Sequence, residues 1–460
     1  MRTNLMLLTA FMLLTFVTNM SARHESEGVK DAIEILKGKS DTNTAEWAVD
    51  VLNSVSDTAM MPIAKNALAM AYLTGRVLPP DTVKAVRMLE EAIRFGSVNA
   101  CHNLGVYYKN LPRDRQNFHK AYEYFKEGAK NGKGLCCYDV GYMLYKGLGC
   151  KQNYAEAVSY FQMDIQRSPS SMYMLALCYR NGYGVEQDEA KAQELLQMSS
   201  VANYRSAIEE ELRDGAEVVE NHALSEANQS AIIPDVMPYI ESFLNHSSDI
   251  TGTYNGSIVT YDWSGTNIIK VQPLSITFHK VGNLYSGSLI VTGDTIPLVC
   301  TINDSGDLIF QGTSLQMYDR YIESKKADYS VESASLVPLG NGLTGSLRLY
   351  SETMGEPDRP MYVSLTKSSC DLSSDKRQCQ VTAYPLNGDN VEVCFSLPTD
   401  VSSSSVSLYS QSGLLVKHYD AGAMSSGTHS IIIKVPSGKE TYIVTMHSDK
   451  YHGETLIRIN

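Results

Sequence analysis

A pattern of about 36 residues repeats between residues 68 and 199. Each unit begins at a large aliphatic residue: Leu68, Leu104, Val140 and Leu175. The next residue is small in every unit: Ala69, Gly105, Gly141 and Ala176. An alanine and then a large apolar residue follow: Ala85 and Leu89, Ala121 and Phe125, Ala157 and Phe161, Ala192 and Leu196. A period of this length predicts a solenoid whose units bury their apolar faces only against their neighbours, which favours binding over catalysis.

Each unit also carries the start and stop signals of two antiparallel helices. Glycine closes helices in the left-handed conformation, and it stands at the expected end of the first helix in three units: Gly75, Gly147 and Gly182. The second unit has Leu111 at this place, so we expect Asn110 to adopt that conformation instead. An N-cap residue precedes the second helix in every unit: Asp81, Asn117, Asn153 and Asp188. The small residues then lie where the paired helices approach closely.

These units resemble the Sel1-like repeat family, a relative of the tetratricopeptide repeats. The similarity is clearest in these stretches: Leu104-Gly105-Val106-Tyr107-Tyr108, Tyr145-Lys146-Gly147-Leu148-Gly149, and Tyr179-Arg180-Asn181-Gly182-Tyr183-Gly184-Val185 followed by Asp188, Lys191 and Ala192. The resemblance implies an α/α superhelix that serves other proteins as an adaptor or assembly surface. Cysteine-rich secreted members staple each helix pair with a disulfide. Cys101 and Cys137 occupy one of those cysteine places, but Ile93 and Ala129 occupy the partner places, so this disulfide ladder is not supported.

The first residues read as a secretion signal. Arg2 provides a positive charge, residues 5–17 form an apolar core, and residues 19–22 form a short region suited to cleavage after Ala22. The alternative is a buried N-terminal helix. The apolar core is shorter than the roughly 20 residues of a membrane-spanning helix, so we expect no transmembrane segment. The sequence therefore predicts an exported protein of the periplasm, cell surface or extracellular space.

Charge and cysteine content narrow the possible partners. The net charge of −12 argues against nucleic acid, because no basic stripe offsets the repulsion of phosphates. The nine cysteines are an odd number, so at least one thiol stays free or pairs between chains. Cys370 and Cys379 are close enough in sequence to bridge a loop. Cys136 and Cys137 lie side by side in a predicted helix, and we interpret them as packing residues.

Composition divides the chain into an N-terminal helical part and a β-rich remainder. The predicted helical domain spans residues 25–246, with capping helices at 25–65 and closing helices at 203–246. Glu209, Glu210 and Glu211 are adjacent there, which is typical of a solvated helix face rather than a metal site. From about residue 250 short alternating runs rich in Val, Ile, Thr and Tyr replace the helical period.

Residues 250–368 are predicted to form an antiparallel β domain, either a small barrel or a sandwich. Strand candidates lie at 253–254, 258–261, 268–271, 275–278, 285–291, 296–301, 308–310, 346–350 and 361–365. The expected architecture is similar to a lipocalin-type barrel. Tyrosines are frequent here, which either marks a ligand or glycan face or reflects ordinary cross-strand pairing. Trp263 is the first candidate for ligand binding if the former interpretation holds.

Residues 380–460 are predicted to form a C-terminal β sandwich. Alternation indicates strands at 391–395, 405–409, 414–418, 429–433, 442–446 and 455–459. This region resembles the C-terminal sorting domain of the type IX secretion pathway at Ala383-Tyr384-Pro385, residues 406–409 with Gly413, Tyr442-Ile443-Val444 and Arg458. The resemblance implies an export address that can be removed at the cell surface. Leu386-Asn387 departs from the usual Asn-Pro, and the alternative is an immunoglobulin-like sandwich used as a stalk.

No nucleophile elbow, phosphate-binding glycine loop, zinc-protease helix or paired-cysteine metal knuckle occurs in the sequence. His102 and His119 fall on opposite helices of one unit, and we interpret them as surface or groove residues rather than a zinc site. We therefore predict no cofactor and no metal.

The predicted function is that of a non-catalytic adaptor that binds a protein or peptide partner in the groove of the solenoid. Candidate contact residues project from the first helices of the units: Tyr72, Asn103, Tyr107, Tyr142 and Tyr173. Each of them could equally pack between units. The alternative function is a ligand- or glycan-binding protein that uses residues 250–368, with the repeats as a spacer. A hydrolase built on the same residues is the third class.

Overall fold

The structure is a computed structural model, and it divides into two compact units, Met1–Leu212 and Arg213–Asn460. It describes the following residues: 27–39, 45–130, 134–202, 249–291, 294–303, 306–312, 314–318, 326–367, 377–386, 389–436, 438 and 440–459. The predicted signal sequence with its cleavage after Ala22, the predicted closing helices at 203–246 and the three adjacent glutamates lie outside these ranges.

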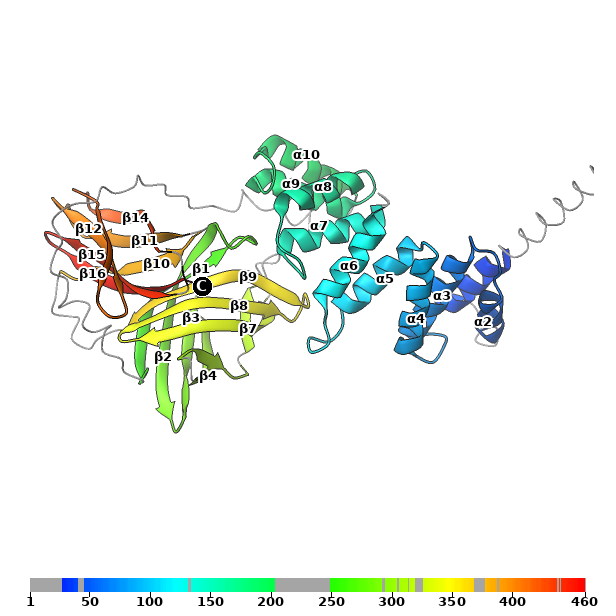
Figure 1. Ribbon diagram of the computed structural model, residues 1–460, viewed down its shortest axis with the longest axis horizontal. Helices are drawn as coiled ribbons and strands as arrows, with labels where there is room; N and C mark the ends of the chain where they lie inside the picture. The colour runs from blue at the N-terminus through cyan, green and yellow to red at the C-terminus, as the bar shows by residue number, and fades with distance from the viewer. Residues whose placement is uncertain are drawn as a thin grey trace, which may run out of the picture. The chain divides into compact units, whose positions relative to one another are not determined.

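The first unit is a row of helical hairpins (Figure 1). Its helices are α2 (Ala45–Asn53), α3 (Met61–Thr74), α4 (Thr82–Arg94), α5 (Val98–Lys109), α6 (Phe118–Ala129), α7 (Cys137–Lys146), α8 (Tyr154–Asp164), α9 (Pro169–Asn181) and α10 (Glu189–Val201). Residues 27–34 are also helical, and two short helices, η1 (Ile35–Lys39) and η3 (Gly134–Cys136), complete the unit. The hairpins α3–α4, α5–α6, α7–α8 and α9–α10 coincide with the four predicted repeats.

The helix ends confirm most of the predicted caps. Each predicted N-cap side chain accepts a hydrogen bond from the backbone N–H three residues on, at 2.9 Å for Asp81, 2.9 Å for Asn117, 3.1 Å for Asn153 and 3.0 Å for Asp188. The three cap glycines have φ angles of 63° to 72°. The prediction for Asn110 is wrong: it ends α5 at φ −99°, because its N–H still reaches the Val106 carbonyl without a left-handed turn.

The periodic residues form the core of the hairpins. All four starting residues are at most 1% exposed, and the four alanines of the second helices are 0% exposed. Gly141 lies against the ring of Phe161, where an added Cβ would stand 2.6 Å from a ring carbon. Between hairpins, the His119 Nδ1 atom lies 3.1 Å from the Gly149 carbonyl oxygen, and Tyr154 stacks on Tyr183 at 4.5 Å. The hairpins therefore touch their successors, as the solenoid prediction requires.

The cysteines among the described residues are all free thiols: Cys101, Cys136, Cys137, Cys150, Cys178, Cys300, Cys379 and Cys394. Cys136 and Cys137 are 0% exposed, which agrees with their predicted packing role. Cys370 lies outside the described ranges, so its predicted bridge to Cys379 stays a prediction.

The second unit begins with a nine-stranded antiparallel sheet of order β5-β4-β3-β2-β1-β9-β8-β7-β6. Its strands are β1 (Gly252–Tyr261), β2 (Ile268–Val281), β3 (Leu284–Val291), β4 (Asp294–Ile302), β5 (Leu308–Phe310), β6 (Ser314–Tyr318), β7 (Lys326–Leu339), β8 (Gly342–Ser351) and β9 (Glu356–Lys367). Two predicted strands, at 268–271 and 275–278, belong to the single strand β2, whereas β6 and β7 have no counterpart among the predicted strands. The antiparallel prediction is confirmed, whereas the strand order does not establish the barrel or sandwich form.

The remaining strands form two further antiparallel sheets, β10-β11-β14 and β13-β12-β15-β16. Their bounds are β10 (Val381–Pro385), β11 (Asn390–Leu397), β12 (Ser404–Ser410), β13 (Leu415–Asp420), β14 (Gly427–Lys434), β15 (Thr441–Ser448) and β16 (His452–Arg458). All six predicted strands overlap an observed one. The β-rich character is thus confirmed, and the immunoglobulin-like type stays a prediction.

The C-terminal sheets share a hydrophobic core with the nine-stranded sheet. Tyr261 and Tyr362 from β1 and β9 lie in the same buried cluster as Tyr384 from β10. The Tyr261 hydroxyl donates to the Pro385 carbonyl at 2.7 Å, and the Tyr362 hydroxyl donates to the Arg458 carbonyl at 3.1 Å. The β regions 250–368 and 380–460 are therefore joined by buried apolar surface as well as by the chain.

Candidate partner-binding site

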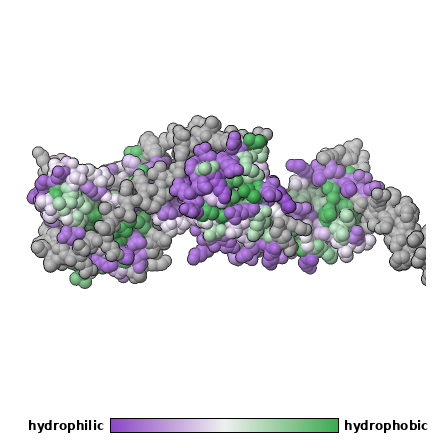
Figure 2. Space-filling view, turned by 90° about the horizontal axis from the view of Figure 1, so that it is seen from above, coloured by the Kyte–Doolittle hydropathy of each residue, from purple (hydrophilic) through white to green (hydrophobic). Residues whose placement is uncertain are grey.

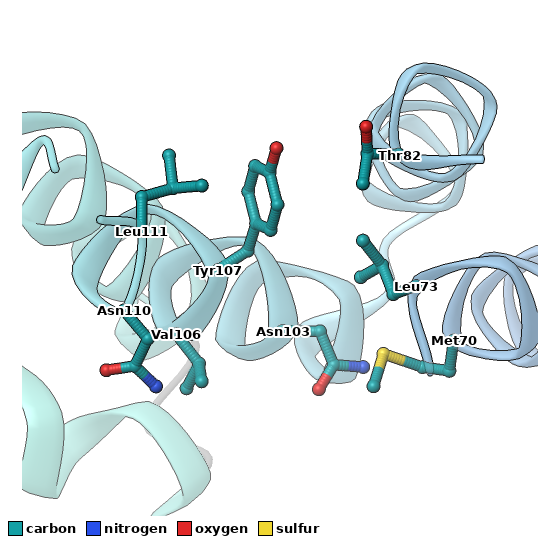
Figure 3. Close-up of a pocket in the computed structure, with 8 residues that line it drawn as sticks. All are labelled: Met70, Leu73, Thr82, Asn103, Val106, Tyr107, Asn110 and Leu111. Carbon is teal, nitrogen blue, oxygen red and sulfur yellow. The ribbon is translucent and has the colours of Figure 1, made fainter. Parts of the chain in front are cut away.

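A cavity of about 280 Å³ opens between the first two repeats (Figure 3). Its walls come from α3, α5, the start of α4 and the residues that follow α5: Met70, Leu73, Thr82, Asn103, Val106, Tyr107, Asn110 and Leu111. Two of the five predicted contact residues, Asn103 and Tyr107, therefore lie together in one cavity. The other lining residues were not among the predicted contacts, because their convergence depends on how α3 and α5 lie side by side.

Side chains of α3, α4 and α5 face one another across the cavity. Figure 3 shows Tyr107 on one side facing Leu73 and Thr82 on the other. Val106 lines the cavity from α5, near Asn110, and the equivalent residue of the next repeat is the much larger Tyr142. The Asn103 amide donates to the Asn66 side chain at 2.8 Å and so ties α5 to α3. The walls are thus held in place by a contact between the repeats.

The chemistry of the cavity is apolar with a few polar groups at its edge. Methionine, leucine and valine supply four of the eight lining residues, and two asparagine amides supply donors and acceptors. Its volume of about 280 Å³ lies just below the range for small-molecule pockets. This lining suits one apolar side chain of a bound polypeptide whose backbone hydrogen-bonds at the edge.

Tyr142 on α7 is the equivalent of Val106 in the next repeat, and the ammonium groups of two lysines lie near its ring. The Lys109 ammonium lies 4.8 Å and the Lys146 ammonium 4.5 Å from the centroid of its ring. Lys146 is only 5% exposed, so its position is set by packing, whereas Lys109 is half-buried. These three residues, the Lys109–Tyr142–Lys146 cluster, place two cationic groups around one aromatic ring.

The other two predicted contact residues have structural roles. The Tyr72 hydroxyl accepts a hydrogen bond from Lys84 at 2.7 Å, and the same ammonium lies 4.2 Å from its ring centroid. Tyrosine and lysine pair in the same way at the equivalent positions of two other repeats, which indicates a helix-packing device. Tyr173 is 4% exposed and lies in the core. Its prediction as a groove contact is therefore wrong, because no surface of the ring is left for a partner.

Trp263, the candidate for ligand binding in the β region, is also buried. It is 6% exposed, and the Arg359 guanidinium lies 5.5 Å from its ring. Asp262 holds the turn around it by accepting hydrogen bonds from the side chains of Ser264 and Asn267 at 2.6 and 2.8 Å. The prediction that Trp263 presents a stacking surface to a ligand is therefore wrong, since the indole packs inside the protein.

Among the described residues of the repeats, histidine and carboxylate side chains pair with each other rather than gather as a cluster of metal ligands. His102 pairs with Asp139 across two repeats, with its Nε2 atom 3.4 Å from a carboxylate oxygen. Burial raises the pKa of Asp139 to about 7 and lowers the pKa of His102. Within the described ranges no group of three or more His, Cys, Asp or Glu side chains could hold a metal ion.

A second cavity of about 460 Å³ lies at the third repeat. Its lining is more polar: Tyr122, Leu144, Cys150, Lys151, Gln152, Asn153 and Glu156. Burial raises the pKa of the Cys150 thiol to about 11, so this cysteine stays protonated at neutral pH and is a poor nucleophile.

Stacked helical hairpins with a lined cavity between successive repeats define a repeat solenoid. Residues 62–200 consist of four Sel1 repeats, since the Sel1 repeat model matches residues 62–96, 98–133, 134–163 and 169–200. No curated protein matches the chain in sequence. Among the residues that the structure describes, no helix has the length and apolar character needed to cross a membrane.

Three solved structures show similarity to the repeats. A Sel1 repeat protein from Oxalobacter formigenes is 22% identical with a TM-score of 0.35, over 39% of this chain and 72% of that one. A protective antigen of uropathogenic Escherichia coli strains with an SLR fold is 20% identical with a TM-score of 0.36, over 42% of this chain and 41% of that one. The Helicobacter pylori cysteine rich protein B is 19% identical with a TM-score of 0.25, over 30% of this chain and 99% of that one.

Proposed function

We propose that this protein is a non-catalytic scaffold that binds a protein or peptide partner along the first helices of its Sel1 repeats. The observation that carries this proposal is the cavity between α3 and α5, which contains Asn103 and Tyr107. Sel1 repeats are typical of protein-interaction scaffolds. Hydrophobic patches also interrupt the polar surface of the helical unit (Figure 2).

The shape of the site supports a polypeptide partner over a small ligand. The cavity opens on the row of first helices, which repeats along the solenoid and offers further contacts on either side. A partner that places one apolar anchor in the cavity gains most of its affinity there, while neighbouring contacts exclude water. The glycan-binding alternative has lost its leading residue, because Trp263 is buried.

The test is to fill the cavity and follow a bound partner. Val106→Trp places an indole in the cavity, and we expect it to abolish co-purification of the partner from the native host. Phe95→Ala is the matched control, because Phe95 is an aromatic residue that is 45% exposed and lies outside the cavity lining. Equal recovery of the partner with both variants, each shown to be folded by circular dichroism, would refute binding at this cavity.

We propose further that the protein is exported, on the strength of residues 1–22. The mature protein is expected to begin at Arg23 and to be found in the periplasm, at the cell surface or in the medium. N-terminal sequencing of the protein recovered from each cell fraction tests this, and full-length protein confined to the cytosol would contradict it.

The packing of residues 380–460 against the nine-stranded sheet bears on whether they are removed as a sorting domain. Removing residues 380–460 would expose Tyr261 and Tyr362, which are 4% and 1% exposed in the intact protein. We therefore propose that this region stays attached after export. Intact mass spectrometry of the exported protein distinguishes retention from the removal that the sorting-domain resemblance implies.

A further inference from the structure

The residues of the cavity have equivalents in the next repeat, 36 positions further on. Leu73 corresponds to Lys109, Val106 to Tyr142, and Asn110 to Lys146. The Lys109–Tyr142–Lys146 cluster is therefore the counterpart of the cavity at the following step of the solenoid. The solenoid thus has an apolar cavity between its first and second repeats and a basic cluster between its second and third repeats.

The cluster concentrates positive charge where little water remains. Both ammonium groups lie within 5 Å of one ring centroid, and Lys146 is 5% exposed. The Lys109 ammonium partly offsets the rise that burial causes in the pKa of Asp139, and this carboxyl lies mostly buried beside His102. Lysine in the last turn of a helix also complements the helix dipole, which accounts for the placement of Lys109 and Lys146 at the ends of α5 and α7. The dipole alone does not account for their convergence on one tyrosine.

The charge of the repeats differs from that of the whole chain. Residues 62–200 contain 17 Lys and Arg against 13 Asp and Glu, although the chain as a whole contains 39 against 51. The repeats are thus basic within an acidic protein. A basic surface attracts an acidic partner and raises its rate of association.

We propose that the surface formed by α3, α5 and α7 binds an acidic peptide segment, with an apolar side chain in the cavity and a carboxylate at Lys109, the half-buried lysine of the Lys109–Tyr142–Lys146 cluster. This inference rests on the proposed scaffold function and adds the chemistry of the partner. Neighbouring helices pack about 10 Å apart, and an extended chain advances about 3.3 Å per residue. The apolar residue and the Asp or Glu of the partner are therefore about three positions apart.

The experiment uses the purified chain of residues 23–460 and an array of synthetic 12-residue peptides of random sequence. We expect the bound peptides to share a large aliphatic residue about three positions from an Asp or Glu. The affinity of the best peptide, measured by fluorescence anisotropy, should fall at least tenfold with Lys109→Glu and fivefold with Lys109→Gln, and it should weaken as salt rises.

Lys191→Glu is the matched control. Lys191 also lies over a tyrosine ring, at 4.3 Å from the centroid of Tyr179, but it is exposed and belongs to neither the cavity nor the cluster. We expect this variant to change the affinity less than twofold. An equal loss with Lys109→Glu and Lys191→Glu would overturn the inference, because it would show only a non-specific effect of charge.

The outcomes separate this inference from the proposed function. If the bound peptides lack acidic residues and their binding is lost with Val106→Trp, the acidic motif is refuted. The scaffold function is then still supported. Array binding that depends on neither Val106 nor Lys109 would overturn both, as would the absence of any binding peptide. Circular dichroism of every variant establishes that a loss of affinity is not a loss of fold.

Discussion

At the scale of single residues, the repeats depend on side chains that close helix ends or leave room for a neighbour. The N-cap residues satisfy backbone N–H groups that have no partner within the helix. Gly141 leaves space for the ring of Phe161, and no larger residue fits without displacing that ring. These contacts are local, so single substitutions have effects whose size can be estimated.

Asn117→Ala should lower the free energy of unfolding of the helical unit by about 1 kcal/mol. The substitution removes the acceptor of the Lys120 N–H, which is bonded at 2.9 Å. Asn117→Asp keeps an acceptor at the same place and should remain within a few tenths of a kcal/mol of the wild type. Urea denaturation followed by far-ultraviolet circular dichroism measures both variants, and equal losses would show that the cap contributes nothing.

Glu454 should make the stability of the second unit depend on pH. Burial raises the pKa of its carboxyl from 4.5 to about 7, so the folded protein keeps a proton that the unfolded chain releases. The free energy of unfolding should therefore decrease as pH rises from about 4.5 to about 7. Glu454→Gln has no carboxyl group that titrates. Its free energy of unfolding should exceed that of the wild type by up to about 3 kcal/mol at pH 8 and should match it at pH 4.

Denaturation of both proteins across this pH range, monitored by tyrosine fluorescence, provides the measurement. Taking the difference between variant and wild type removes the contribution of Asp139, whose pKa is also raised to about 7 by burial. A difference that does not change between pH 4 and pH 8 would contradict the expected titration of Glu454.

At the scale of elements, the two halves of the chain are assembled in different ways. The hairpins of the helical unit contact mainly their neighbours in sequence, as solenoid repeats do. In the second unit β1 pairs with β9, which joins two runs of sequential antiparallel strands into one sheet. Tyr362 on β9 also bonds to Arg458 on the last strand. The β unit thus combines hairpins of consecutive strands with pairings between segments distant in sequence.

A protease site inserted within residues 368–376 of the full chain tests the shared core. After cleavage we expect the two fragments to remain together on size-exclusion chromatography, because Tyr261, Tyr362 and Tyr384 lie in one buried cluster. A control in 1 M sodium chloride should give the same result, since apolar burial resists screening by salt. Fragments that separate without denaturant would show that the C-terminal sheets are an independent domain.

At the scale of the whole molecule, the two compact units should unfold in separate transitions. Leu104→Ala creates a cavity in the helical core and should destabilise only the helical transition, by about 2–5 kcal/mol. Val444→Ala should act in the same way on the β transition only, because Val444 is 0% exposed in its core. Differential scanning calorimetry resolves the transitions, and a single transition that both variants shift would refute independent unfolding.

The sequence by itself determined the solenoid, its register and its caps. Capping, close helix approach and apolar periodicity act between residues that are near in the chain. Each of these signals can therefore be recognised from the sequence alone. Asn110 was the exception among the helix ends, because a helix can also stop without a left-handed residue. For the β half, alternation predicted most strands but not β6, β7 or the order of the sheet.

Only the tertiary structure decided which predicted residues meet. Asn103 and Tyr107 line one cavity because α3 lies beside α5, whereas Tyr173 and Trp263 are buried. It also decided that β1 pairs with β9 and that residues 380–460 share a core with the nine-stranded sheet. Exposure and long-range pairing depend on the packing of segments distant in sequence, and local propensity carries no information about that packing.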